Sequence, residues 1–136
     1  MKRWRTVFVD TVGLLALWNR RDQWHTAAVT AFVPLATGPV RLVSTTAVFL
    51  ECGNAACRTP FRGQVTPTMS RMAAAGDLLV PTDSDVVNAW AAYDRGEANN
   101  AGVVDQISFA VMRRLHLTEA FTNDGHFRAA GFITLF

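Results

Sequence analysis

Short apolar runs alternate with helical segments along the chain, and this alternation is what most constrains its fold. The runs expected to form strands are 6–10, 41–44, 78–80, 119–122 and 132–135. Helices are expected between them at 11–18, 22–36, 45–58, 60–76, 84–96 and 103–115. Strands separated by helices pair in parallel, with helices on both faces of the sheet. The order therefore predicts an α/β fold of three layers, with a mainly parallel central sheet of about five short strands.

The length of the chain and its composition favour one folded domain over residues 1–136. Of the 136 residues, 50% are hydrophobic and 18% are charged, which excludes the composition of a disordered protein. No internal repeat or linker divides the chain. Cys52 and Cys57 lie in one predicted helix at a spacing that suits neither a local disulfide nor a zinc site, so we expect both to be reduced core residues.

The charge of the chain and its first residues say little about its partners. A net charge of +2 is too small to indicate nucleic-acid binding, although every basic residue except Lys2 is an arginine, whose planar group suits phosphate oxygens. Lys2, Arg3 and Arg5 precede the apolar stretch 7–18, in the manner of a signal peptide. Asp10 interrupts that stretch, which is also too short to cross a bilayer. We therefore predict a cytoplasmic protein with no membrane association.

Acidic residues from separate segments are predicted to meet at one edge of the sheet. Asp10 ends the first strand, and Asp124 follows the fourth strand by two residues. Asp105 opens the preceding helix, and the chain must double back along that helix to form the fourth strand. Glu51 lies about a turn and a half into the helix after the second strand. All of these positions are near the carboxyl ends of the strands, where parallel sheets bind their ligands.

The position of Asp105 on its helix indicates that its side chain faces inward. At about 100° per residue, Asp105 falls between Phe109 and Met112 within the apolar arc of the helix. The opposite side is expected to carry Gln106, Ala110 and Arg114. A carboxylate that faces inward needs hydrogen bonds, a cation or a proton.

Grouped carboxylates of this kind favour a bound divalent cation. Two carboxylates about 5 Å apart repel by roughly 3 kcal/mol at an effective dielectric constant near 20. Oxygen ligands favour Mg²⁺ or Mn²⁺ over zinc, and such ions promote the hydrolysis of phosphate esters. Taken singly, each acid has a structural explanation, since Asp10 and Asp105 suit helix N-termini and Asp124 suits a turn. The combination of the acids nevertheless predicts a metal site.

Several stretches of the sequence also match a known pattern in order and spacing over essentially the whole chain. They are VFVDT at 7–11, RDQWH at 21–25, FLE at 49–51 with Asn54, VDQISFAVMR at 104–113, TNDGHF at 122–127 and GF at 131–132. With these motifs the chain resembles the PIN-domain ribonucleases, most closely the VapC-like toxins of type II toxin–antitoxin pairs. The resemblance implies a three-layer PIN-like domain and cleavage of RNA. It also implies a cognate antitoxin protein as partner, and a homodimer.

The resemblance assigns roles to particular residues. It implies that the catalytic acids, which hold one or two Mg²⁺ or Mn²⁺ ions, are Asp10, Glu51, Asp105 and Asp124. Thr11 and Thr122 correspond to supporting hydroxyl groups. Two departures from the family pattern are Gly125, where a basic or bulky residue is common, and the segment 96–102, which lacks the usual serine or threonine.

Other residues have weaker assignments. We expect Arg113, Arg114 and Arg128 to flank the site and to contact RNA phosphates. Trp18 and Trp24 are candidates for a groove that binds an antitoxin segment. We expect His25 and His126 to have structural roles.

Two alternatives to a nuclease remain. One is a catalytically inactive PIN-like module that binds RNA or protein. The other is a phosphatase of the haloacid-dehalogenase type, because VFVDTVG resembles the nucleophile loop of that family. That loop needs a second acid two residues after the nucleophile, where this chain has Val12.

Overall fold

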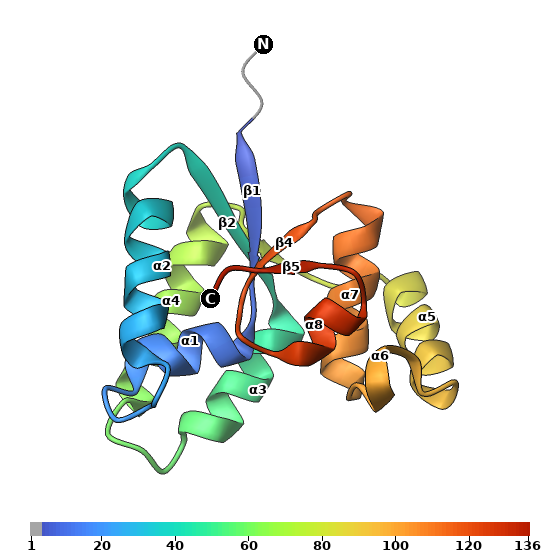
Figure 1. Cartoon of the computed structure of the whole chain (residues 1–136), viewed down its shortest axis with the longest axis horizontal. Helices are drawn as coiled ribbons and strands as arrows, with labels where there is room; N and C mark the ends of the chain where they lie inside the picture. Colours follow the sequence, from blue (N-terminus) through green and yellow to red (C-terminus); the bar gives the residue numbers. More distant parts are fainter. Residues whose placement is uncertain (1–3) are drawn as a thin grey trace.

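The computed structural model describes residues 4–136, and Lys2 and Arg3 lie outside this range. Its centre is a parallel sheet with the strand order β3-β2-β1-β4-β5 (Figure 1). The strands are β1 (Arg5–Val9), β2 (Val40–Thr45), β3 (Leu78–Leu79), β4 (Glu119–Phe121) and β5 (Ile133–Thr134). The predicted α/β fold is confirmed, and every described strand pair is parallel.

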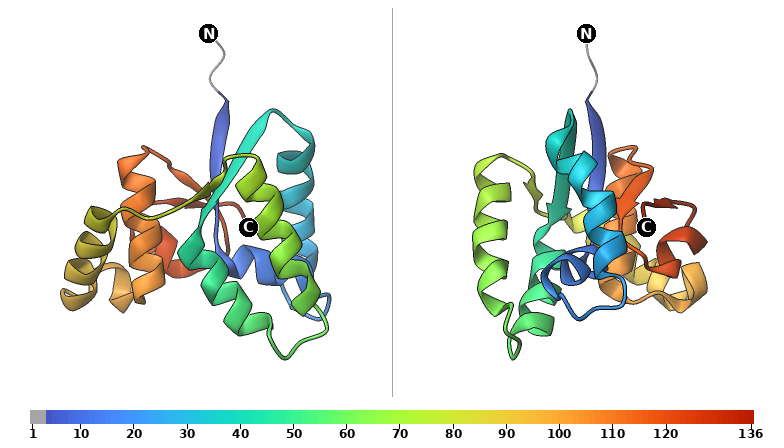
Figure 2. Two further views of the ribbon diagram at one scale, coloured as in Figure 1. Left: turned by 180° about the vertical axis from the view of Figure 1, so that it is seen from behind. Right: turned by 60° about the vertical axis from the view of Figure 1, so that its left-hand side comes forward.

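Helices cover both sides of this sheet. They are α1 (Thr11–Trp18), α2 (His25–Thr37), α3 (Thr46–Ala56), α4 (Val65–Ala74), α5 (Asp83–Asp94), α6 (Glu97–Asn100), α7 (Val103–Arg114) and α8 (Gly125–Ala129), with a 3₁₀ turn, η1, at Arg62–Gln64. Helices α1, α2 and α4 lie on one side, and α5, α6 and α7 lie on the other (Figures 1 and 2). Among the described residues, no helix is both long enough and apolar enough to span a membrane.

The first strand is the most buried part of the sheet. Val7, Phe8 and Val9 are at most 2% exposed, because β1 is paired on both edges, to β2 and to β4. An apolar run of this kind suits a strand covered on both faces. Asp10 directly follows this run, so its carboxylate lies at the carboxyl edge of the sheet, at the end of the most buried strand.

Two strand-to-helix junctions at this edge are capped by side chains. The carboxylate of Asp10 accepts a hydrogen bond from the Val12 amide at the start of α1. The hydroxyl of Thr45 accepts one from the Val48 amide, 3.2 Å away, at the start of α3. Such side-chain caps satisfy amide groups that a helix leaves unpaired at its first turn.

Some boundaries and burial predictions are wrong. Helix α2 begins at His25, because the Asp22 carboxylate holds a turn by accepting the Trp24 amide at 2.8 Å. Of the two cysteines, which are both free, Cys52 is buried but Cys57 is exposed. Gln106, which was expected on the side of α7 opposite the apolar arc, is only 2% exposed, because α5 and α6 cover that side.

Helices α6 and α8 were not predicted. The segment 96–102 contains α6, in which Ala98, Asn99 and Asn100 have φ values of 56°, 57° and 58°. The expected turn at 123–125 is the beginning of α8, whose N-cap is Asp124. Both helices lie next to the beginning of α7 or the end of β4, and they therefore shape the edge where the acids were predicted to meet.

Candidate active site

Four acidic side chains share one electrostatic neighbourhood at the carboxyl edge of the sheet. Asp10 follows β1, Glu51 lies on α3, Asp105 is in the first turn of α7 and Asp124 caps α8. The negative charges of the other three acids all raise the pKa of Asp105. The acids that the sequence placed at this edge are therefore near enough for their charges to act on Asp105, and Asp105 and Asp124 have ligand atoms within 4.8 Å of each other.

Asp10 is the most buried of these acids, with 1% exposure. One carboxylate oxygen, Oδ2, accepts a hydrogen bond from the Thr122 hydroxyl at 2.8 Å. The other, Oδ1, is buried without a hydrogen-bond partner among residues 4–136. Burial raises the pKa of Asp10 to about 7 despite these hydrogen bonds, and the charge of Asp124 contributes further. A bound cation or a proton would satisfy Oδ1.

The pKa of Asp105 is also raised, by burial and by the neighbouring acids together. Burial is the largest cause that raises its pKa to about 8, followed by the charges of Asp10, Asp124 and Glu51. A hydrogen bond with Asp124 also favours the protonated form. Two acids with raised pKa values at one edge are a feature of binding and catalytic sites, although structural networks show it as well.

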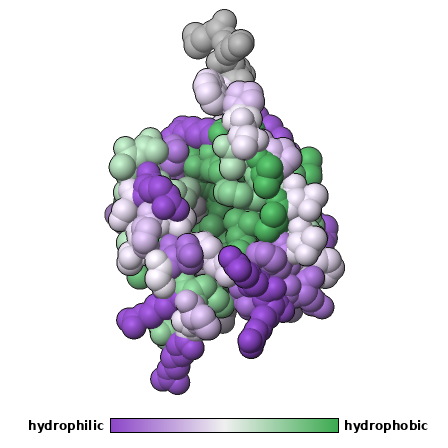
Figure 3. Space-filling model, turned by 90° about the vertical axis from the view of Figure 1, so that its left-hand side faces the viewer, coloured by the Kyte–Doolittle hydropathy of each residue, from purple (hydrophilic) through white to green (hydrophobic). Residues whose placement is uncertain are grey.

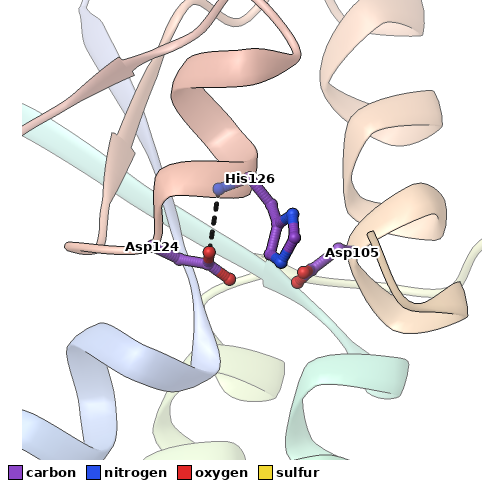
Figure 4. Close-up of side chains that lie close together, drawn as sticks. All are labelled: Asp105, Asp124 and His126. Carbon is purple, nitrogen blue, oxygen red and sulfur yellow. Dashed lines mark hydrogen bonds between the residues drawn. The ribbon is translucent and has the colours of Figure 1, made fainter. Parts of the chain in front are cut away.

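His126 joins this group, which sequence reasoning missed. Ligand atoms of Asp105, Asp124 and His126 all lie within 4.8 Å of one another. One ring nitrogen of His126 points between the two carboxylates (Figure 4). Its place follows from the short helix α8, in which the His126 amide donates to Asp124 Oδ1 at 2.9 Å. The position of His126 two residues after Asp124 was the available signal, but only a helix turns it toward the acids.

The two predicted threonines are placed differently. Thr122 is fully buried and connects two acids, because its hydroxyl donates to Asp10 and accepts the Asp124 amide at 3.1 Å. The hydroxyl of Thr11 instead donates to the Val48 carbonyl, 3.5 Å away, on the neighbouring helix α3. Thr122 thus acts directly on the acids, whereas Thr11 ties α1 to α3.

Two of the three predicted arginines lie away from the acids. Arg114 forms a two-pronged ion pair with the buried carboxylate of Asp85, with distances of 2.8 to 3.2 Å. Arg113 donates to the Ala130 carbonyl at 3.2 Å. Both lie at the end of α7, roughly 12 Å along the helix axis from the acid that opens it, and their contact with RNA phosphates remains a prediction. Arg128, which donates to the Thr134 hydroxyl at 3.1 Å, is on α8 and closer to Asp124 in the chain.

The structure also contains an apolar hollow on the side of α2 and α4. A cavity of about 180 Å³ lies there between the helices and the sheet, and apolar side chains line most of the hollow (Figure 3). The cavity is lined by Val9, Leu14, Phe32, Leu42, Thr68, Arg71 and Met72. A second cavity, of about 450 Å³, includes Trp18 and Phe61 in its lining but not Trp24. Trp24 is exposed outside this cavity, and a groove that Trp18 and Trp24 share for an antitoxin segment remains a prediction.

Comparison with known proteins identifies similar structures. No protein-family model and no curated protein matches the chain. The solved structure of VapC20 from Mycobacterium tuberculosis, a toxin that cleaves the sarcin-ricin loop, is 27% identical over 93% of this chain and 96% of that chain, with a TM-score of 0.77.

More distant similarity shows the same fold. FitAB bound to a DNA fragment is 15% identical, covering 94% of this chain and 92% of that chain, with a TM-score of 0.64. DNA-bound VapBC from Salmonella typhimurium is 9% identical over 97% of each chain, with a TM-score of 0.60. Taken with the parallel sheet and its order of strands, these similarities show that the chain has the fold of the VapC-like PIN-domain toxins.

Proposed function

We propose that this protein is a metal-dependent endoribonuclease, the toxin of a toxin–antitoxin pair, and that it hydrolyses RNA phosphodiesters at Asp10, Glu51, Asp105 and Asp124. The observation that carries the proposal is the buried carboxylate of Asp10, whose Oδ1 has no partner among the described residues and which lies near Asp105. In a fold shared with a toxin that cleaves the sarcin-ricin loop, such an oxygen supports a metal site.

The residues present fit a divalent cation. Carboxylate oxygens are the ligands that Mg²⁺ and Mn²⁺ prefer, and we assign one or two such ions to the acids, with Asp10 and Asp105 as direct ligands. When bound, the ion supplies charge stabilisation for the phosphate and lowers the pKa of a coordinated water. The raised pKa values of Asp10 and Asp105 indicate that neither acid is readily ionised without a cation beside it.

The protein itself orients the acids. The Thr122 hydroxyl fixes Oδ2 of Asp10 and leaves Oδ1 available, and the same hydroxyl oxygen holds the amide of Asp124. Asp124 is further fixed as the N-cap of α8. Fixed ligands lose little conformational entropy when they bind an ion or a phosphate, which is the advantage of a preorganised site.

RNA and a cognate antitoxin are the partners that we assign to the protein. The RNA assignment rests on the similarity to VapC20, a toxin that cleaves the sarcin-ricin loop. For the antitoxin, the apolar hollow between α2 and α4 offers a surface that an apolar helix would cover. We further propose that the protein acts in the cytoplasm as a homodimer of single-domain chains over residues 1–136.

A cleavage assay with matched variants tests the proposal. The purified protein is expected to cut RNA that contains a sarcin-ricin loop in Mg²⁺ or Mn²⁺ and to stop in EDTA. Asp10→Asn and Asp105→Asn are expected to lose at least about 100-fold in rate with an unchanged circular dichroism spectrum. The exposed acid Asp94 provides the control variant Asp94→Asn, which should cleave normally. Full activity in both active-site variants would refute the nuclease mechanism.

A further inference from the structure

The ring of His126 is held in one orientation by a backbone carbonyl. Its Nδ1 lies 2.9 Å from the carbonyl oxygen of Ala98, on α6. A carbonyl oxygen only accepts hydrogen bonds, so Nδ1 carries the hydrogen, and in the neutral ring the lone pair is on Nε2. Nδ1 is therefore hydrogen-bonded to the backbone, and the lone pair of Nε2 is free to coordinate a cation.

The free nitrogen faces the acids. The ring lies between Asp105 and Asp124, with the ligand atoms of all three residues within 4.8 Å of one another (Figure 4). A histidine that binds a metal commonly donates its other ring N–H to a backbone carbonyl or a carboxylate, which fixes the ring and its tautomer. His126 has both features of such a ligand, an orienting hydrogen bond on one nitrogen and carboxylates around the other.

The orienting carbonyl belongs to an unusual piece of backbone. Ala98, Asn99 and Asn100 are successive residues with positive φ, a conformation that costs roughly 1–2 kcal/mol for each residue with a Cβ. The neighbouring carbonyl of Glu97 accepts the side-chain amide of buried Gln106 at 2.9 Å. Side chains from α7 and α8 thus hold the turn, and strained backbone of this kind is concentrated at functional sites.

Asp10 provides a second, independent sign that a ligand binds here. Its Oδ1 is buried and has no partner in the part of the chain that the structure describes, and its charge acts on Asp105, a member of the His126 group. Carboxylates alone would suit Mg²⁺ as well as Mn²⁺. An imidazole nitrogen shifts the preference toward transition-metal ions, because Mg²⁺ selects oxygen ligands.

We propose that Nε2 of His126 is a direct ligand of the metal, so that the site has mixed oxygen and nitrogen donors and prefers Mn²⁺ to Mg²⁺. This inference rests on the metal site of the proposed function and adds a ligand to it. The Ala98 carbonyl is then a positioning group, since it contacts the ring and not the ion. The turn at 98–100 serves to place that carbonyl behind the ring.

Metal binding to the purified full-length chain tests this assignment without any assay of activity. The diagnostic variant is His126→Asn, whose amide nitrogen can replace Nδ1 as donor to Ala98 while the nitrogen that faces the acids is removed. The matched control is His25→Asn, because Nδ1 of His25 is likewise bonded to a backbone carbonyl, that of Ala16, at 2.8 Å. His25 is not a member of any potential metal-binding group among the described residues.

Pulsed electron paramagnetic resonance of bound Mn²⁺ gives the first readout. Wild type and His25→Asn should show the ¹⁴N coupling of a coordinated imidazole, and His126→Asn should lack it. Isothermal titration gives the second readout, in which His126→Asn should weaken Mn²⁺ binding by about tenfold or more and Mg²⁺ binding by less than about threefold. No ¹⁴N coupling in the wild type, or an unchanged ratio of Mn²⁺ to Mg²⁺ affinity in His126→Asn, would overturn the assignment.

The variant Asp10→Asn separates this inference from the function on which it rests. If Asp10→Asn abolishes metal binding while His126→Asn changes nothing, His126 is not a ligand but the carboxylate site stands. If the wild type binds neither ion, both the metal site and the histidine ligand are refuted.

Discussion

Replacing Asp105 by asparagine is expected to stabilise the metal-free protein at alkaline pH. Burial and the charges of the neighbouring acids raise the pKa of Asp105 from 3.8 to about 8. At pH values between these two pKa values, Asp105 keeps its proton in the folded protein and loses it in the unfolded chain. The free energy of unfolding therefore falls as the pH rises. An asparagine does not ionise and avoids this loss, so the variant gains on the wild type as the pH rises through the same window.

The size of the effect follows from the pKa. Each tenfold change in proton affinity corresponds to about 1.36 kcal/mol, so a rise from about pH 5 to about pH 8 gives at most about 4 kcal/mol. Asp105 is only partly buried, and solvent screens its interactions, so we halve this limit to about 2 kcal/mol. For a chain of 136 residues, about 2 kcal/mol corresponds to a rise of roughly 6–8 °C in Tm.

Urea unfolding in EDTA at about pH 5 and about pH 8 measures this difference. The control Asp94→Asn removes an exposed acid and should stay within about 0.5 kcal/mol of the wild type at both values. Saturating Mn²⁺ at the higher pH should reverse the order, because only the wild type gains the full binding energy. The electrostatic reasoning fails if Asp105→Asn is no more stable than the wild type at about pH 8, or if its advantage is the same at both pH values.

Three further substitutions test the packing around the acids. Thr122→Val removes the hydroxyl that holds two acids and should lower the free energy of unfolding by about 1–3 kcal/mol in urea, with no loss if the bonds are dispensable. Gln106→Leu leaves the Glu97 carbonyl without its side-chain donor, so hydrogen exchange at residues 98–100 should accelerate about tenfold, and unchanged exchange would contradict this. Gly13→Ala places a methyl group against the backbone and ring of Phe121, and should cost about 3 kcal/mol in thermal unfolding; a neutral result would show that α1 shifts freely.

The sheet and the meeting of the acids were predictable from local sequence. An apolar run that is followed by an acid, such as the run before Asp10, predicts a buried strand. It also predicts that the acid caps the next helix at the edge of the sheet. Helix α7 was placed from its apolar period, and Asp105 in its first turn followed. These features depend on short-range patterns, and parallel order then brings the ends of the strands together.

The missed features depend on contacts between distant segments. The left-handed turn at 98–100 has only its two asparagines as a local signal, and it is held by Gln106 and His126 from other helices. The burial of Gln106 could not be read from the period of α7, because that period does not show that α5 packs on its second side. Arg113 and Arg114, which were expected to flank the site, lie at the far end of the helix that Asp105 opens.

The acidic cluster is assembled from residues in two separate halves of the chain. Asp10 and Glu51 come before Gly76, whereas Asp105, Asp124 and His126 come after it, and β1 pairs with β4 across the division, with Phe8 opposite Ala120. A polypeptide cut at the exposed turn near Gly76 would yield two fragments, neither of which holds all the acids. Metal binding by a mixture of the two fragments would then show that β1 and β4 have paired again. The split protein would in this way report whether its two halves fold together.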